Sequence, residues 1–146
     1  MTTPEYKVVE WSGEPGLMVL AQEWADECGI EDYSPDAALN DILDMRQRGD
    51  CKLFALMLGE EIVGGLGITI LDMFWSDDCY SAVRYCYVKP LHRPAALKLI
   101  AKARKWSMYM RCPKMLFCSN TLCKPTDKFL KALQFKEFET VYIRDI

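Results

Sequence analysis

Two long apolar runs constrain the fold of this chain more than any other feature. Residues 51–58 read CKLFALML and residues 61–71 read EIVGGLGITIL, and both are rich in the residues that strands favour. They meet at the polar residues GEE, which predicts a β-hairpin. Because each run is apolar along most of its length, we expect both strands to be central in a sheet.

Helix and strand signals surround this hairpin. Ser34 can cap a helix, Pro35 suits its first position and Gly49 is typical of its end, so a helix is predicted between them. Apolar spacing predicts another helix over Leu17–Cys28, with Gly29 as its cap. The other expected elements are strands in EYKVV, YSAVRYCYV, MLFCS and KEFETVYIR, and helices over ALKLIAKARKW and Thr126–Leu133. The order β-α-α-β-β-β-α-β-α-β predicts an α/β (α+β) fold, with a mixed central sheet of about six strands flanked by helices.

Composition indicates a globular, soluble protein. The chain has 146 residues, 51% hydrophobic and 27% charged, which suits a single domain spanning residues 1–146. No apolar stretch reaches the roughly 18 residues of a membrane span, and the first residues lack a signal pattern. We therefore expect a cytoplasmic protein with no membrane partner. The net charge of −3 argues against nucleic acid as a partner, and seven cysteines without a CxxC pair, beside one histidine, argue against a metal site.

The segment VKPLHRPAALKLIAKARKW, residues 88–106, is the main functional signal. It has the pattern of a strand end, a short bend and a basic amphipathic helix. A helix N-terminus offers unpaired N–H groups and the positive end of the helix dipole, both of which suit a phosphate. The segment therefore predicts a phosphate-binding turn, although it contains no glycine.

Three motifs carry a family resemblance that covers nearly the whole chain. They are the hairpin LFALMLGEEIVGGLGI, the segment YVKPLHR running into ALKLIAKARKW, and CSN followed by DKFLKALQF. With these motifs in this order, the chain resembles the GCN5-related N-acetyltransferase (GNAT) superfamily, and it is similar to compact, glycine-poor members encoded by bacteriophages. The resemblance implies the GNAT fold, acetyl-CoA (coenzyme A) as cofactor and an amine as acceptor.

The resemblance also implies a cofactor site. In the family, coenzyme A lies where the fourth strand splays from the fifth, so Tyr87 and Val88 are expected to meet its pantetheine arm. Arg93 is expected to hold the pyrophosphate together with the amides that follow it, which belong to Ala95, Ala96, Leu97 and Lys98. Asn120, just past the fifth strand, is an expected polar contact. Pro94 and Ala96 lie near the positions of the family's glycines, and Pro94 removes one amide donor.

The catalytic groups match the family pattern least. Leu130 stands where the family commonly has a tyrosine acid, and no carboxylate lies between Cys79 and Val88. We therefore expect Tyr85, Tyr87 and Asp78 to serve in proton transfer, with both tyrosines on one face of their strand. Glu60 and Glu61 are alternative bases acting through water, or simply a solvated hairpin turn. The alternative for the tyrosines is packing, with the hydroxyl at the rim of the core.

Two further expectations concern side chains near this strand. Arg84 lies in a run that is otherwise apolar, where a charge must be paired or face a cavity. We expect it to pair with an aspartate of the preceding loop, Asp72, Asp77 or Asp78, and the alternative is a contact with the substrate. In the same loop, Phe74 and Trp75 are expected to line an acceptor pocket or to form a dimer contact.

The sequence leaves two functions open. The first is an acyl-CoA-dependent N-acyltransferase that transfers an acetyl group to an amine by direct attack in a ternary complex. The second is a binding or structural protein of the same fold with a degenerate cofactor site. Either is expected to be a monomer or a homodimer, and the sequence does not identify the acceptor.

Overall fold

One mixed sheet organises the chain in the computed structural model, which describes residues 5–13, 15–118, 124–136 and 144, with the backbone alone at 124–127. The elements are β1 (Tyr6–Glu10), α1 (Gly16–Cys28), α2 (Pro35–Gln47), β2 (Cys51–Leu58), β3 (Glu61–Asp72), β4 (Cys79–Val88), a 3₁₀ helix (Pro90–Ala95), α3 (Ala96–Tyr109), β5 (Lys114–Phe117) and α4 (Lys124–Ala132). Within these residues, five strands pair in the order β1-β2-β3-β4-β5, antiparallel except for the parallel pair β4 and β5. The expected strand KEFETVYIR, apart from its end residues, lies outside the described part of the chain.

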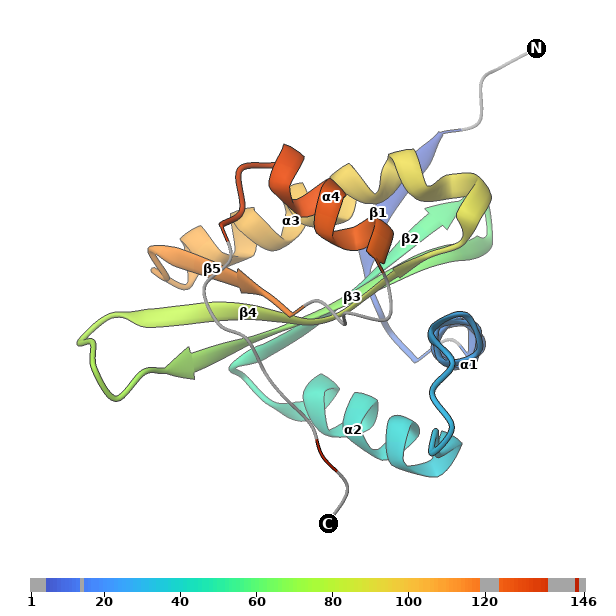
Figure 1. Ribbon diagram of the computed structural model, residues 1–146, viewed down its shortest axis with the longest axis horizontal. Coiled ribbons are helices and arrows are strands. Elements are labelled where there is room, and N and C mark those ends of the chain that lie inside the picture. The colour runs from blue at the N-terminus through green and yellow to red at the C-terminus, as the bar shows by residue number, and fades with distance from the viewer. Residues whose placement is uncertain (1–4, 14, 119–123, 137–143, 145–146) are drawn as a thin grey trace.

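Helices cover both faces of this sheet. Figure 1 shows α1 and α2 on one face and α3 with α4 on the other. Successive residues of β2 point to opposite faces, so Leu53 and Ala55 join the core under α1 and α2, while Phe54 and Leu56 join the core under α3. The strand is apolar along its length because both of its faces are buried, and its predicted central position is confirmed.

The predicted capping signals around α1 and α2 are confirmed with one shift. The Ala37 N–H donates to Ser34 Oγ at 3.2 Å, which satisfies one free donor of the α2 N-terminus. Gly29 ends α1 with a left-handed φ of 66°, which glycine adopts without steric cost. Helix α2 ends at Gln47 with Arg48 as its C-terminal cap, one residue before the predicted Gly49.

The glycine-rich part of β3 serves packing and strand geometry. A Cβ atom at Gly65 would lie 2.5 Å from Leu17 Cδ2, so α1 packs directly on the backbone of β3. At Gly67 the register between β3 and β4 shifts: Gly67 faces Tyr85 and the next residue, Ile68, faces Val83. Arg84 is therefore the extra residue of a β-bulge in β4.

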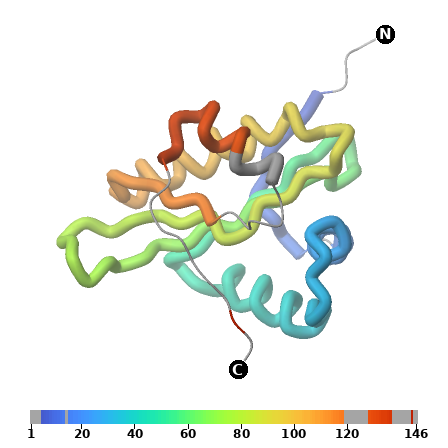
Figure 2. Tube along the Cα trace, viewed as in Figure 1, coloured from blue at the N-terminus to red at the C-terminus, as the bar shows by residue number. Residues whose placement is uncertain are grey.

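Strands β3 and β4 extend beyond the rest of the sheet as a hairpin, as the Cα trace in Figure 2 shows. Their last pairs join Leu71 with Tyr80 and Asp72 with Cys79. Among the described residues, no helix is long and apolar enough to span a membrane.

Candidate functional site

Strand β4 separates from β5 halfway along its length. The parallel pairing runs from Tyr80, opposite Lys114, to Val83, opposite Phe117, and the Cys118 N–H then donates to the Val83 carbonyl at 3.1 Å. Beyond Val83, no strand within the described residues pairs with this edge of β4. The Lys89 N–H donates to the Val63 carbonyl of β3 at 2.9 Å. Backbone N–H and C=O groups of successive strand residues point to opposite sides, so those of Val88 and Cys86 point toward the open edge.

The bulge brings two neighbouring side chains of β4 to one carboxylate. The Tyr85 hydroxyl donates to Asp41 of α2, and the Arg84 guanidinium lies 3.7 Å from the same carboxylate. The predicted pairing of Arg84 with Asp72, Asp77 or Asp78 is therefore wrong. The bulge is the physical reason, because it turns Arg84 and Tyr85 toward α2 together, whereas consecutive residues of a regular strand point to opposite faces.

The surroundings of Tyr85 keep its hydroxyl protonated. Burial of the ring, followed by the hydrogen bond to Asp41, raises the pKa of the Tyr85 hydroxyl to about 12. Its proton thus remains on the oxygen at neutral pH. Asp41 is the residue that sequence reasoning missed here, because nothing in its local pattern distinguishes it from the other acids of α2.

Tyr87 lies on the same face as Tyr85, as predicted, but contacts a different helix. It packs against the apolar cluster under α1 and α2, and the Arg93 guanidinium carbon lies 5.9 Å from its ring centre. Burial, followed by the charge of Glu27, raises the pKa of the Tyr87 hydroxyl. The structure therefore places Tyr87 beside the expected anion site rather than beside Asp41.

Arg93 closes the end of β4. Its Nε donates to the Val88 carbonyl at 3.2 Å, so these two expected cofactor residues do lie together. Its Nη2 also lies 2.6 Å from each carboxylate oxygen of Glu27 in α1. Glu27 was likewise not predicted, since only the packing of α1 on β3 brings it to this point.

The helical run after β4 begins earlier than expected. The 3₁₀ helix starts at Pro90 and leads into α3 without a break, and the Ala96 N–H already donates to the Arg93 carbonyl. Fewer free amides therefore remain between Ala95 and Leu97 than an isolated helix start would offer. The Lys98 ammonium donates to the Tyr6 carbonyl of β1 at 3.3 Å, and the Tyr6 hydroxyl lies 2.8 Å from His92 Nδ1.

The other residues singled out from the sequence do not join the group around Arg84 and Tyr85. Asp78 lies at the hairpin turn, seven residues from Tyr85, which corresponds to about 23 Å along an extended strand. Its predicted place in the same catalytic group is therefore not supported by the fold. Asn120 lies outside the described residues. Leu130 is buried, with 7% of its surface exposed, so the position of the family's tyrosine is part of the core.

Coenzyme A fits one half of this site better than the other. The open edge of β4 offers the Cys86 backbone groups and the Val88 N–H, which suit the amides of a pantetheine arm. The pyrophosphate end requires Arg93 to exchange the Glu27 carboxylate for a phosphate, with few amides to assist it. The residues present therefore fit the cofactor, provided that this ion pair opens.

Comparison with solved structures shows which fold the chain has. No protein-family model and no curated protein sequence matches the chain. Aminoglycoside N-acetyltransferase AAC(6')-Iy, in complex with CoA, has a TM-score of 0.82 at 18% identity, covering 99% of this chain and 97% of that chain. A Trypanosoma brucei acetyltransferase has a TM-score of 0.71 at 21% identity, covering 99% and 100%. The chain has the GNAT fold.

The GNAT fold is not tied to one activity among these structures. A transcriptional regulator from Bacillus halodurans has a TM-score of 0.80 at 17% identity and covers 97% of this chain and 100% of that chain. Identities at this level establish a shared fold, and the function must be argued from the site.

Proposed function

We propose that this chain is an acyl-CoA-dependent N-acyltransferase that transfers an acetyl group to an amine by direct attack. The observation that carries the proposal is the separation of β4 from β5 after Val83, next to a bulge whose side chains meet Asp41. AAC(6')-Iy, which has the same fold, binds CoA and a CoA-linked bisubstrate analogue in its solved structures.

Asp41 is the residue best placed to receive the acceptor. Attack forms a C–N bond and breaks a C–S bond, so the amine loses a proton and the departing thiolate gains one. The Asp41 side chain is 33% exposed, which leaves it accessible to an amine while Arg84 and Tyr85 hold it. Asp41 then accepts the amine proton, directly or through water. The Tyr85 hydroxyl gives its proton to the thiolate and regains one from Asp41 through their hydrogen bond.

The cofactor residues divide between the two ends of the open edge. When bound, acetyl-CoA supplies the activated acyl thioester. The backbone groups of Cys86 and the Val88 N–H pair with the pantetheine arm, and Tyr87 packs beside it. Arg93 binds the pyrophosphate with the donors left free near Ala95, Ala96, Leu97 and Lys98. Asn120 remains the proposed contact past β5.

The direct experiment follows acetyl transfer. The protein is incubated with acetyl-CoA and a panel of small amines, including polyamines and aminoglycosides, and each amine is analysed by mass spectrometry. A mass increase of one acetyl group on an amine, lost in the Asp41→Asn variant, supports the proposal. No acetylated product with any amine, together with no binding of coenzyme A in solution, contradicts it.

A binding protein with a degenerate cofactor site is the second candidate. The ion pair between Arg93 and Glu27 and the early helical run favour it, because both use groups that an anion would need. Thermal unfolding separates the two candidates. A ligand at one hundred times its dissociation constant stabilises a protein by about 2.7 kcal/mol. An unchanged melting temperature at millimolar coenzyme A therefore favours the second candidate.

A further inference from the structure

Exposed aromatic side chains gather at the turn of the β3–β4 hairpin. We call residues 72–78 the hairpin tip. Phe74 has 96% of its surface exposed and Trp75 has 52%, and their ring centres lie 4.9 Å apart in an edge-to-face arrangement. Two large apolar side chains held together in water at the end of a projecting hairpin are typical of a protein contact.

The hairpin tip is also acidic. Residues 71–79 read LDMFWSDDC and contain Asp72, Asp77 and Asp78 but no lysine or arginine. A membrane with anionic lipids would repel this tip. A surface that accepts it must therefore combine apolar side chains with positive charge.

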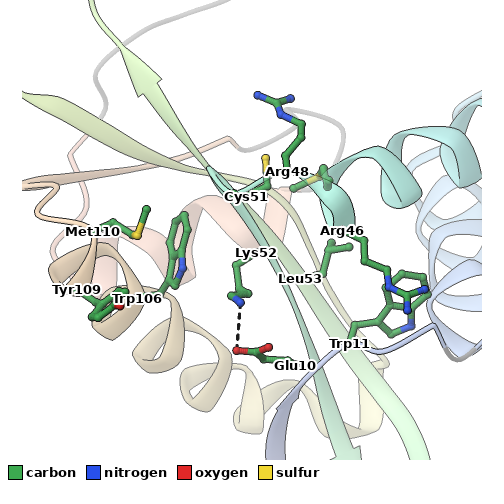
Figure 3. A pocket seen from close by; sticks show the side chains of 12 residues that line it. Glu10, Trp11, Arg46, Arg48, Cys51, Lys52, Leu53, Trp106, Tyr109 and Met110 are labelled. Atoms are coloured by element: carbon green, nitrogen blue, oxygen red, sulfur yellow. Dashed lines mark ion pairs between the residues drawn. The ribbon is translucent and has the colours of Figure 1, made fainter.

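Such a surface lies at the start of β2, before the residues that pair with β1. Figure 3 shows this cavity, which we call the edge pocket, between α2 on one side and α3 on the other. Its volume is about 250 Å³. Its aromatic walls are Trp11, Trp106 and Tyr109, and its charged lining residues are Glu10, Arg46, Arg48 and Lys52.

The size of the edge pocket suits a side chain better than a free ligand. Clefts that bind small molecules commonly enclose roughly 300–1,000 Å³, and this cavity is smaller. Its aromatic walls can contact another ring edge to face. The pocket therefore has the dimensions and chemistry to receive one aromatic residue.

The uncompensated positive charge of the edge pocket lies on Arg46, because Lys52 pairs with Glu10 at 3.2 Å and Arg48 pairs with Asp44 and Asp50. The Arg46 guanidinium lies 5.7 Å from the Trp11 ring centre, and no described carboxylate lies within ion-pair distance of it. Lys105 precedes Tyr109 by one helical turn and so lies on the same side of α3. Helix α3 contains four basic residues and no acidic one, so its charge is opposite to that of the hairpin tip.

The tip and the pocket lie near the same end of the molecule, but they are separated within one chain. The start of β2 pairs with β3 at Thr69, and the Ile70 N–H donates to the Asp50 carbonyl at 2.9 Å. Strand β3 continues past Ile70 to Asp72, the turn that holds Phe74 follows, and the hairpin projects away from the rest of the sheet (Figure 2). The tip is thus directed away from the pocket of its own chain.

We propose that two copies of this chain form a reciprocal dimer in which the hairpin tip of each enters the edge pocket of the other. A twofold arrangement uses both tips and both pockets and closes on itself. Each large aromatic side chain buries about 150–250 Å², so the four rings of two tips bury at most about 600–1,000 Å². This is less than the roughly 1,200–2,000 Å² of a stable specific interface and suits a weak, transient contact. We expect a reversible dimer whose affinity falls as salt concentration rises.

The test is the mass of the full chain in solution. Analytical ultracentrifugation from low micromolar to about 100 μM should show a shift toward twice the 16.8 kDa of one chain. The double variant Phe74→Ser with Trp75→Ser should remain at 16.8 kDa throughout. The matched control is Val19→Ser, which removes an exposed apolar side chain of α1, 55% exposed, and should dimerise like the wild type.

A charge exchange identifies the pocket as the partner of the tip. Asp77→Lys with Asp78→Lys should weaken the dimer at least tenfold, and so should Arg46→Glu in the pocket. Combining all three changes in one chain should restore most of the affinity, because the tip is then positive and the pocket negative. A monomeric wild type at about 100 μM, a dimer in the serine double variant, or no restoration in the triple variant would each overturn the proposal.

Discussion

The Arg93 guanidinium lies with Nη2 2.6 Å from both carboxylate oxygens of Glu27. The same side chain donates to the Val88 carbonyl, so α1 is joined to the end of β4 where the cofactor's pyrophosphate is expected. An anion that binds Arg93 must compete with this carboxylate. The pair therefore controls how strongly the proposed site attracts phosphate.

Removing the competing charge should tighten cofactor binding. In Glu27→Gln, Arg93 loses its ionic partner and becomes available to the pyrophosphate. Partly exposed ion pairs are worth about 0.2–1 kcal/mol, so we expect up to about fivefold tighter binding of coenzyme A by isothermal titration calorimetry. Glu31→Gln removes the same charge from an exposed position between α1 and α2 and should leave the affinity unchanged. Equal effects of the two variants would contradict a specific role for Glu27.

Removing Arg93 should have the opposite effect. Hydrogen bonds to charged groups contribute about 1.5–3 kcal/mol, so Arg93→Ala should weaken coenzyme A binding by about tenfold or more in the same titration. Arg104→Ala, which removes an exposed arginine of α3, is the control. If Arg93→Ala binds coenzyme A as the wild type does, the pyrophosphate does not lie at Arg93.

Asp41 should affect acetyl transfer and not cofactor binding. General base catalysis contributes roughly 10²–10⁴-fold, so we expect Asp41→Asn to lower kcat/KM for the acceptor by about 100-fold or more. The KM for acetyl-CoA should stay within about twofold of the wild-type value, because a partly exposed contact contributes little to binding. Asp44→Asn, which removes the carboxylate paired with Arg48 on the same helix, should have little effect on either constant. Loss of acetyl-CoA affinity in Asp41→Asn would indicate a structural role instead.

Tyr85 should make stability fall at high pH. Its pKa is about 12 in the folded chain and near the ordinary value of about 10 when unfolded, so the folded state retains the proton more strongly. The resulting stability is fully present below pH 10 and is lost as the pH rises from about 10 to about 12. The urea midpoint of the wild type should therefore fall relative to that of Tyr85→Phe as the pH rises across this window. Relative to Tyr109→Phe, which changes an exposed position of α3 and keeps Tyr85, the wild-type midpoint should not change.

Gly65 should tolerate no side chain. The added methyl group of Gly65→Ala would meet Leu17 Cδ2 at 2.5 Å, so the buried Leu17 side chain must reorient or α1 must move away from β3. Overpacking of this kind costs about 1–3 kcal/mol, which a urea unfolding curve resolves as a lower midpoint. Gly49→Ala is the control, because nothing lies within 4 Å of the added Cβ and its φ is not left-handed. A Gly65→Ala midpoint equal to that of the control would show that Leu17 or α1 can adjust at no cost.

Local signals predicted the elements well because each depends on neighbouring residues. The capping hydroxyl of Ser34, the left-handed Gly29 and the strands of the central hairpin act within a few positions of themselves. The site was predicted less completely. Arg93 and Val88 do meet, but the partners Asp41 and Glu27 come from helices 44 and 66 positions away in sequence from the residues they contact, Tyr85 and Arg93.

The sequence by itself determined the order of the elements, which faces of the helices and strands are apolar, and the basic helix after β4. It did so because periodicity and turn chemistry are local properties. Only the tertiary structure decided the bulge at Arg84, the meeting of Tyr85 with Asp41, and the ion pair that occupies Arg93. These features depend on strand register and on how closely α1 and α2 pack against glycines of β3. A shift of one residue in that register would turn the same side chains to the opposite face of the sheet.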